Sequence, residues 1–258
     1  MQGREPMSTV HFEVDEAVAT ITIDAPERRN ALTAQLLSDL RTHLDTAESD
    51  RTVRTVVLTH TGPVFSSGMD LTNVADVAPS DQPINAFPAL LLRVRDFPKP
   101  VIARVAGRAR AGGVGLIAAC DITIAVPSAD FAISEVRMGL VPAVISVPVL
   151  ARVQLAAAAE LFLTGETFDA ERARSIGLIN IVAPDLDAEV ARYTAMFRLC
   201  EPRALAATKE LLRRDRSSLT VSADLAAMSA LSAEFFSSPQ AAEGIAAFRA
   251  KRNPRWAE

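Results

Sequence analysis

The sequence predicts an α/β layered fold that ends in a helical region. Apolar, β-branched segments typical of buried strands alternate with helical segments up to about Leu150. After that point, alanine-rich helical patterns replace nearly all of the strand signals. The chain has 258 residues, of which 49% are hydrophobic, so it can bury one large core with a smaller appendage.

The first elements are a hairpin and a helix. Residues 10–14 and 18–23 have the residue pattern of two strands, and Asp15-Glu16 lies where the chain turns between them. Thr33 is a suitable N-cap for the helix that follows. That helix carries apolar residues at helical spacing, namely Leu36, Leu37, Leu40 and Leu44.

Three further buried strands follow. Residues 53–59 are apolar and β-branched, and the segments "KPVIARVAG" and "DITIAV" have the same character. A glycine turn follows the first of these strands, and a longer glycine stretch follows the second. A proline-marked loop at 79–88 precedes a short predicted helix at 89–95.

The C-terminal part is mostly helical. One strand, "GLINIVA", interrupts a series of predicted helices at 169–175, 186–200, 203–213, 219–236 and 240–251. We therefore expect an α/β core over residues 1–195 and a helical region over 196–258. No internal sequence repeat is evident.

Composition excludes several classes of function. The net charge of −4 and the sequence pI near 5.5 do not indicate the basic surface that nucleic-acid binding requires. No apolar run approaches the ~20 residues of a membrane span, and the N-terminus lacks the apolar segment of a signal peptide. Cys120 and Cys200 lie in apolar, helical surroundings and are expected to be buried thiols, as in a reducing cytoplasm. The three histidines have no metal-ligand spacing, so we predict no metal site.

Two familiar motifs fit poorly. Gly113, Gly115 and Ala118 match the loose dinucleotide pattern G-x-G-x-x-A, but "GRARA" separates them from the preceding strand, which disfavours a nicotinamide oxidoreductase. There is no P-loop and no G-x-S-x-G sequence, so Ser66 and Ser67 are poor candidates for a nucleophile.

The two glycine turns, "FSSGMDL" and "AGGVGLIAACD", could instead supply backbone donors. A helix that begins near Gly112 leaves its first N–H groups unpaired and adds a partial positive charge. Gly68 could likewise expose the N–H of Met69. Two such donors aimed at one oxygen would form an oxyanion hole. Considered without any other part of the sequence, the two glycine stretches could also be ordinary turns.

An ordered set of segments resembles the crotonase, or enoyl-CoA hydratase/isomerase, superfamily over nearly the whole chain. The segments are "PERRNAL", "VFSSGMDL", "VAGRARAGGVGLIAACDITIA", "FAISEVRMGLVP", "TGETFDAERARSIGLINIV" and "EGIAAFRAKR". The resemblance implies a ClpP/crotonase-like ββα-spiral core with a C-terminal helical trimerisation region. It also implies a homotrimer or a dimer of trimers in the cytoplasm.

The resemblance also implies roles for individual residues. The N–H groups of Met69 and Gly112 would hold the thioester carbonyl of an acyl-CoA, and Glu135 would move the proton. Gly115 stands where hydratases of the family carry a second glutamate, and we expect its missing side chain to leave room for water or a bulkier acyl group. The family comparison favours hydration of a 2-enoyl-CoA. Double-bond isomerisation and non-catalytic acyl-CoA binding remain alternatives.

Further positions match the CoA contacts of the family. Arg28 or Arg29 and Lys251 would lie near the CoA phosphates, and the backbone of Ser67 would contact the adenine. The resemblance also places Gly68, Asp70, Gly113 and Gly115 at the acyl-CoA site. It implies no metal or redox cofactor, because coenzyme A arrives as part of the substrate.

Two charged residues allow more than one interpretation. Glu135 is flanked by apolar residues, which predicts a partly desolvated carboxyl with a raised pKa, but it could be a surface carboxylate beside Arg137. Arg110 could attract a carboxylate on the acyl group, or it could be solvated or paired within the protein.

Overall fold

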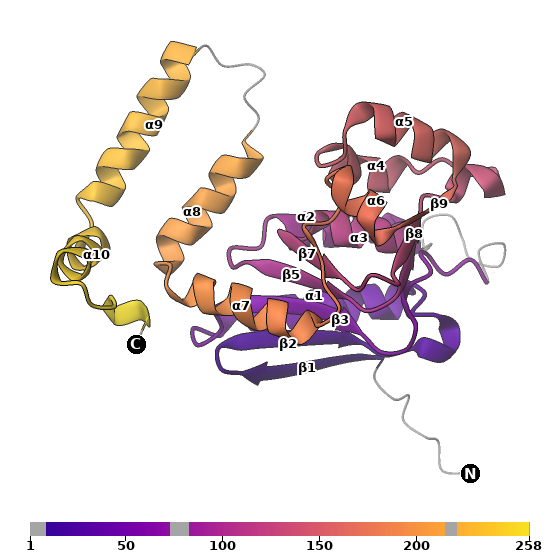
Figure 1. Cartoon of the computed structure of the whole chain (residues 1–258), viewed down its shortest axis with the longest axis horizontal. Coiled ribbons are helices and arrows are strands. Elements are labelled where there is room, and N and C mark those ends of the chain that lie inside the picture. The colour runs from indigo at the N-terminus through magenta and orange to yellow at the C-terminus, as the bar shows by residue number, and fades with distance from the viewer. Residues whose placement is uncertain (1–8, 73–82, 215–220, 258) are drawn as a thin grey trace, which may run out of the picture. The chain divides into compact units, whose positions relative to one another are not determined.

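The computed structural model describes residues 9–72, 83–214 and 221–257. The chain forms two compact units, Met1–Arg192 and Tyr193–Glu258, and helix α7 (Leu186–Arg198) continues through the boundary (Figure 1). That the C-terminal part, predicted as residues 196–258, serves trimerisation stays a prediction.

The first unit begins with the predicted hairpin. Strands β1 (Val10–Asp15) and β2 (Val18–Ile23) pair antiparallel, and the turn residues are Glu16 and Ala17, one position later than predicted. Both turn residues have positive φ, 45° and 67°. Two left-handed residues in succession match the twist of the flanking strands, which explains the shift of the turn.

The large sheet has six strands in the order β1-β2-β3-β5-β7-β10, and every pairing after β1·β2 is parallel. The central strands are β3 (Thr55–His60), β5 (Val101–Val105) and β7 (Ile122–Ala125), and β10 (Ile181–Val182) forms one edge. All six residues of β3 are buried, as expected for a parallel strand covered on both faces.

A second sheet was not predicted. It has the order β4-β6-β8-β9, with β4 (Val64–Ser66), β6 (Arg108–Arg110) and β8 (Asp130–Ala132) parallel and β9 (Thr167–Asp169) antiparallel at the edge. Each of these strands has three residues. A strand this short is too brief to show the period-2 alternation that identifies strands in a sequence.

The two sheets are built by one repeated path of the chain. A strand of the large sheet is followed by a strand of the small sheet and then by a helix, giving β3-β4-α2, β5-β6-α3 and β7-β8-α4. The helices are α2 (Phe87–Arg95), α3 (Gly112–Ala119) and α4 (Ala143–Leu150). This ββα repetition, followed by a helical C-terminal region, confirms the predicted fold class.

Most predicted helices are present with small shifts at their ends. Helix α1 (Ala34–Ser49) is capped by the hydroxyl of Thr33, which accepts a hydrogen bond from the Leu36 N–H at 3.1 Å. Residues 79–82 and 219–220 of two predicted segments lie outside the described residues. The C-terminal helices are α6 (Ala170–Ser175), α8 (Pro202–Arg213), α9 (Val221–Phe236) and α10 (Pro239–Ala250).

Two helices were missed by sequence reasoning. Helix α4 contains Pro148, which disfavours a helix interior. Both α4 and α5 (Leu155–Thr164) are apolar over most of their length, so neither shows a broad polar face opposite an apolar one. Short 3₁₀ turns complete the unit at η1 (Pro26–Arg28), η4 (Pro83–Asn85) and η5 (Glu135–Met138), and η6 (Arg255–Ala257) ends the second unit.

Both cysteines are free thiols. Cys120 is buried as predicted, whereas Cys200, which follows the end of α7, is only half-buried. Within residues 9–72, 83–214 and 221–257, no helix has the length and apolar character needed to cross a bilayer. The cytoplasmic location stays a prediction.

Candidate active site

The site lies where three neighbouring strands of the small sheet end. Ser66 of β4 is paired with Ala109 of β6, which is paired with Phe131 of β8. Met69, Gly112 and Ser134 each follow three positions after these paired residues, and Glu135 comes next. Because the three strands are parallel, their carboxyl ends meet at one edge, where α/β proteins commonly bind ligands.

The first loop leaves the Met69 N–H available. Gly68 has φ +92°, a conformation that side chains rarely adopt, and its carbonyl accepts the Leu32 N–H at 2.8 Å. The neighbouring donors are engaged, since the Gly68 N–H donates to Ser66 Oγ at 3.1 Å and the Asp70 N–H to the Leu32 carbonyl at 3.2 Å. In the described part of the chain, the Met69 N–H donates no hydrogen bond.

The second loop presents the start of α3. Ala111 precedes it with φ 48° and ψ −117°, and its carbonyl accepts the N–H groups of Val114 and Gly115. The N–H of Gly112 has no acceptor among the described residues and lies at the positive end of the helix. A Cβ built on Gly68 would lie 3.3 Å from the Gly112 nitrogen, so the two loops are in direct contact.

Glu135 is the buried carboxyl of the site. Its residue is 9% exposed, and its Oε2 has no hydrogen-bond partner among the described residues. Burial raises the pKa of the Glu135 carboxyl, and a hydrogen bond from its own backbone N–H opposes part of this rise. The alternative of a surface carboxylate beside Arg137 is wrong, because Glu135 is buried and Arg137 Nε donates to the Thr164 carbonyl at 2.8 Å.

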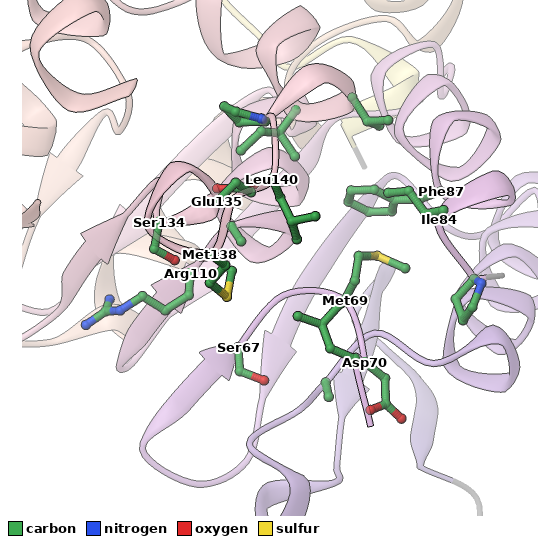
Figure 2. A pocket seen from close by; sticks show the side chains of 18 of the residues that line it. Ser67, Met69, Asp70, Ile84, Phe87, Arg110, Ser134, Glu135, Met138 and Leu140 are labelled. Carbon is green, nitrogen blue, oxygen red and sulfur yellow. The ribbon is translucent and has the colours of Figure 1, made fainter. Parts of the chain in front are cut away.

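These groups line one pocket of about 920 Å³ (Figure 2). Ser67, Arg110 and Ser134 supply polar side chains, and Glu135 lies near Leu140 (Figure 2). The remaining wall is largely apolar and was not predicted. Its side chains come from α2, α4 and the segments before them, and they include Met69, Ile84, Phe87, Met138, Leu140, Val144 and Ile145. No spacing in the sequence connects these segments, so only the fold could reveal this wall.

Gly115 does not leave open space, contrary to the expectation from the sequence. A Cβ at this position would lie 2.5 Å from Ile145 Cγ2 and 2.9 Å from Ile145 Cβ. The isoleucine of α4 therefore occupies the place of the missing side chain, and Gly115 itself does not line the pocket. Gly68 and Gly113 are also absent from the lining, and a Cβ on Gly113 would lie 2.8 Å from the Ser66 carbonyl oxygen.

Several of the residues predicted to contact CoA lie along the same pocket. Arg28 and Arg29 line it, and Arg28 forms a 2.7 Å ion pair with Asp70. Hydrogen bonds from the side chain and backbone of Thr72 lower the pKa of Asp70, with a smaller contribution from Arg28. The Ser67 N–H donates to the Arg29 carbonyl at 3.0 Å, which fixes the two segments together.

Lys251 lies in the second unit. It ends α10 with a positive φ of 52°, and its side chain is exposed. Its predicted contact with CoA phosphates stays a prediction.

Arg110 is paired within the protein. Its guanidinium forms an ion pair with Asp130 and donates to the carbonyl oxygens of Ala109 and Asp130 at 3.0 and 2.9 Å. This agrees with internal pairing rather than with recognition of an acyl carboxylate.

The histidines have structural partners. His60 Nε2 accepts the Ala106 N–H at 2.9 Å, His11 pairs with Asp24, and the ring of His43 stacks on Phe12. Over the described residues, no three acidic, histidine or cysteine side chains gather as metal ligands would.

Comparisons with known proteins show the family to which the chain belongs. The sequence profile of the enoyl-CoA hydratase/isomerase family matches residues 13–258. A Thermus thermophilus protein is 37% identical over 93% of this chain and 97% of its own length. The 2,3-dehydroadipyl-CoA hydratase of Escherichia coli is 32% identical over 96% of this chain and 98% of its own length.

Solved structures show the same similarity. An enoyl-CoA hydratase from Shewanella pealeana superposes with a TM-score of 0.92 at 30% identity, covering 97% of this chain and 96% of that one. An enoyl-CoA hydratase from Mycobacterium smegmatis gives 0.90 at 33% identity, covering 98% of this chain and 100% of that one. The chain belongs to the enoyl-CoA hydratase/isomerase family and has the crotonase fold.

Proposed function

We propose that this protein hydrates a 2-enoyl-CoA thioester with one carboxyl group. The observation that carries the proposal is Glu135. Glu135, Met69 and Gly112 line one pocket, and among the described residues neither Glu135 Oε2 nor the N–H groups of Met69 and Gly112 have a hydrogen-bond partner. A buried carboxyl beside two free donors is suited to removing a proton while negative charge develops on a nearby oxygen.

The steps follow from this arrangement. The thioester carbonyl oxygen accepts hydrogen bonds from Met69 and Gly112. The Glu135 carboxylate takes a proton from water as the water oxygen bonds to C3, and the electron pair of the C2–C3 double bond moves into the enolate. The protonated Glu135 then donates that proton to C2, which restores the thioester carbonyl and the carboxylate. One group acts first as base and then as acid.

The CoA moiety supplies the remaining contacts. We propose that Arg28 and Arg29 bind its phosphates, that the backbone of Ser67 contacts the adenine, and that Lys251 adds a cation within a homotrimer or hexamer. The proposed reaction moves only protons and water, so it requires neither a metal nor a redox cofactor.

Isomerisation of a 3-enoyl-CoA is a second candidate, and Ile145 is the observation that favours it. This side chain occupies the space at position 115, where a second carboxylate would help to hold water. With water poorly held, Glu135 could instead take a proton from C2 and return it to C4.

Incubation with 2-enoyl-CoA and 3-enoyl-CoA thioesters in H₂¹⁸O tests the two proposals. We expect ¹⁸O at C3 of the product from the 2-enoyl substrate. Movement of the double bond without incorporation of ¹⁸O would support isomerisation. Tight binding of both thioesters without any turnover would indicate an acyl-CoA-binding protein and would overturn the proposed enzymatic function.

A further inference from the structure

We infer that Ile145 selects the acyl group, by filling the space beside the reacting carbons that branched substrates need. This inference rests on the proposed function, since it concerns the same site. It arises from the contact between α3 and α4, where a Cβ on Gly115 would lie 2.5 Å from Ile145 Cγ2.

The position of Ile145 along α3 identifies which part of the substrate it faces. Gly115 follows Gly112 by three residues and lies on the same side of the helix, about 4.5 Å further along its axis. The Gly112 N–H is proposed to hold the carbonyl oxygen, C1 of the acyl group. The side chain that covers Gly115 therefore lies beside the next carbons, C2 and C3, and their substituents.

The part of the pocket wall that Ile145 forms is apolar. Ile145 is 3% exposed and offers only CH groups, and the neighbouring Val144 on α4 continues the same surface. Because the isoleucine side chain lies against the backbone of Gly115, it has no space to retreat into. A substrate with a methyl branch at C2 or C3 must compete with Ile145 for this volume, so the wild-type protein should prefer unbranched acyl groups.

The test compares substrates rather than absolute rates. We would measure kcat/KM for a linear four-carbon 2-enoyl-CoA and for its 2-methyl and 3-methyl derivatives, in wild type, Ile145→Ala and Ile145→Val. One methylene in an apolar pocket changes discrimination by about 10–200-fold. We expect the ratio of kcat/KM for the branched substrates to kcat/KM for the linear one to rise at least ~10-fold in Ile145→Ala, and less in Ile145→Val.

Val147→Ala is the matched control. Val147 lies on the same helix, is 71% exposed and does not line the pocket. The substrate ratio of this variant should equal that of wild type. Ile145→Val removes a single methylene and keeps the variant folded if Ile145→Ala is too unstable to purify. A ratio that stays within about twofold of wild type in every folded Ile145 variant would overturn the inference.

A second pair of variants tests the contact itself. Gly115→Ala places a methyl group against Ile145, so alone it should push the isoleucine into the pocket and lower kcat/KM for all three substrates. Combined with Ile145→Ala, the same substitution should cost less, because Cγ2 at 2.5 Å is gone and only the 2.9 Å contact with Cβ of residue 145 remains. If the effects of the two substitutions on kcat/KM were simply additive, a direct contact between the two positions would be contradicted.

Binding measurements separate this inference from the proposed reaction. The affinities of butyryl-CoA and 2-methylbutyryl-CoA, which are saturated, can be measured by calorimetry in wild type and in the Ile145 variants. If wild type turns over no enoyl-CoA, the proposed function fails, while a raised preference for the branched ester in Ile145→Ala still supports the role of Ile145. An unchanged preference would refute that role whether or not the protein is a hydratase.

Discussion

Ala111 and Gly68 pack against each other between the two donor loops, so closely that a Cβ on Gly68 would lie 3.0 Å from the Ala111 methyl group. Ala111 is also held at φ 48° and ψ −117°, a conformation that an L-residue with a side chain rarely adopts. The backbone strain at this residue therefore lies directly before Gly112, whose N–H we propose as an oxyanion donor. Strain of this kind persists where the surrounding structure enforces it, often at functional sites.

Ala111→Gly should stabilise the protein. A residue in such a conformation costs about 1–3 kcal/mol, and the greater freedom of glycine in the unfolded chain offsets part of the gain. We expect the free energy of unfolding to rise by about 1 kcal/mol in urea titrations. Ala109→Gly, in the adjoining strand without positive φ, is the control and should be destabilising. A loss of stability in Ala111→Gly would show that the residue is not strained.

Gly112→Val should impair turnover and spare CoA binding. A Cβ at this position would lie 3.0 Å from Leu32 Cδ1 and 3.5 Å from the Phe87 ring, so the side chain would crowd the start of α3 and displace the thioester oxygen. Loss of one oxyanion donor costs ~10²–10³ in kcat. We expect a decrease of ~10²-fold or more, with the affinity for free CoA, measured by calorimetry, nearly unchanged.

Two serine variants serve as controls for that experiment. Ser67→Ala should be mild, because its hydroxyl has no role in the proposed chemistry. Ser66→Ala should be more harmful than Ser67→Ala, because Ser66 Oγ accepts the Gly68 N–H and supports the first loop. If Ser67→Ala abolished activity while Gly112→Val did not, a hydroxyl nucleophile would replace the oxyanion-hole interpretation.

Glu135→Gln should abolish turnover and leave acyl-CoA affinity nearly intact, because the amide has the shape of the carboxyl but cannot exchange the proton. Both quantities can be measured on one preparation, by a hydration assay and by calorimetry with a saturated acyl-CoA. Removal of a general acid–base group typically costs 10²–10⁴ in rate. Activity within tenfold of wild type would mean that another group moves the proton.

The pH dependence should report the ionisation of Glu135. As a base it must be ionised, and burial raises its pKa above the ordinary 4.5. We expect kcat/KM to rise with pH through a single ionisation whose midpoint lies above that value. The free energy of unfolding should change with pH in the opposite direction, because the Glu135 carboxyl holds its proton more tightly in the folded protein than in the unfolded chain.

The contribution of Glu135 to the free energy of unfolding should therefore fall as pH rises from 4.5 through its folded pKa. Glu135→Gln lacks this ionisation, so it should gain stability over wild type at neutral pH and gain less near pH 4. Urea titrations of both proteins at the two pH values would measure the difference. An equal gain at both values would contradict a raised pKa.

The second unit is expected to mediate assembly. Large apolar side chains are exposed on its helices, among them Leu212, Phe236 and Phe248. We infer that these side chains belong to a protein interface, since apolar patches on a surface mark such interfaces. We predict a homotrimer or a dimer of trimers in sedimentation equilibrium. A monomer at micromolar concentration would contradict this prediction and the proposed role of Lys251.

Much of the fold could be predicted from local patterns in the sequence, and the position of the candidate site from the resemblance to the crotonase superfamily. The buried strands of the large sheet, the Thr33 cap and the C-terminal helices all follow from periodicity and capping, which act within a few residues. The two glycine stretches indicated backbone donors at Met69 and Gly112, and the apolar neighbours of Glu135 indicated its burial. These features required no knowledge of distant contacts.

The tertiary structure alone decided how these parts meet. The small sheet consists of strands of three residues, too short for any pattern, yet their parallel pairing brings the loops at Met69, Gly112 and Glu135 to one edge. The occupation of the space at Gly115 by Ile145 joins residues from two helices. A glycine in a sequence shows that a side chain is missing, but only close packing between elements distant in the chain determines whether the space it leaves is open or filled.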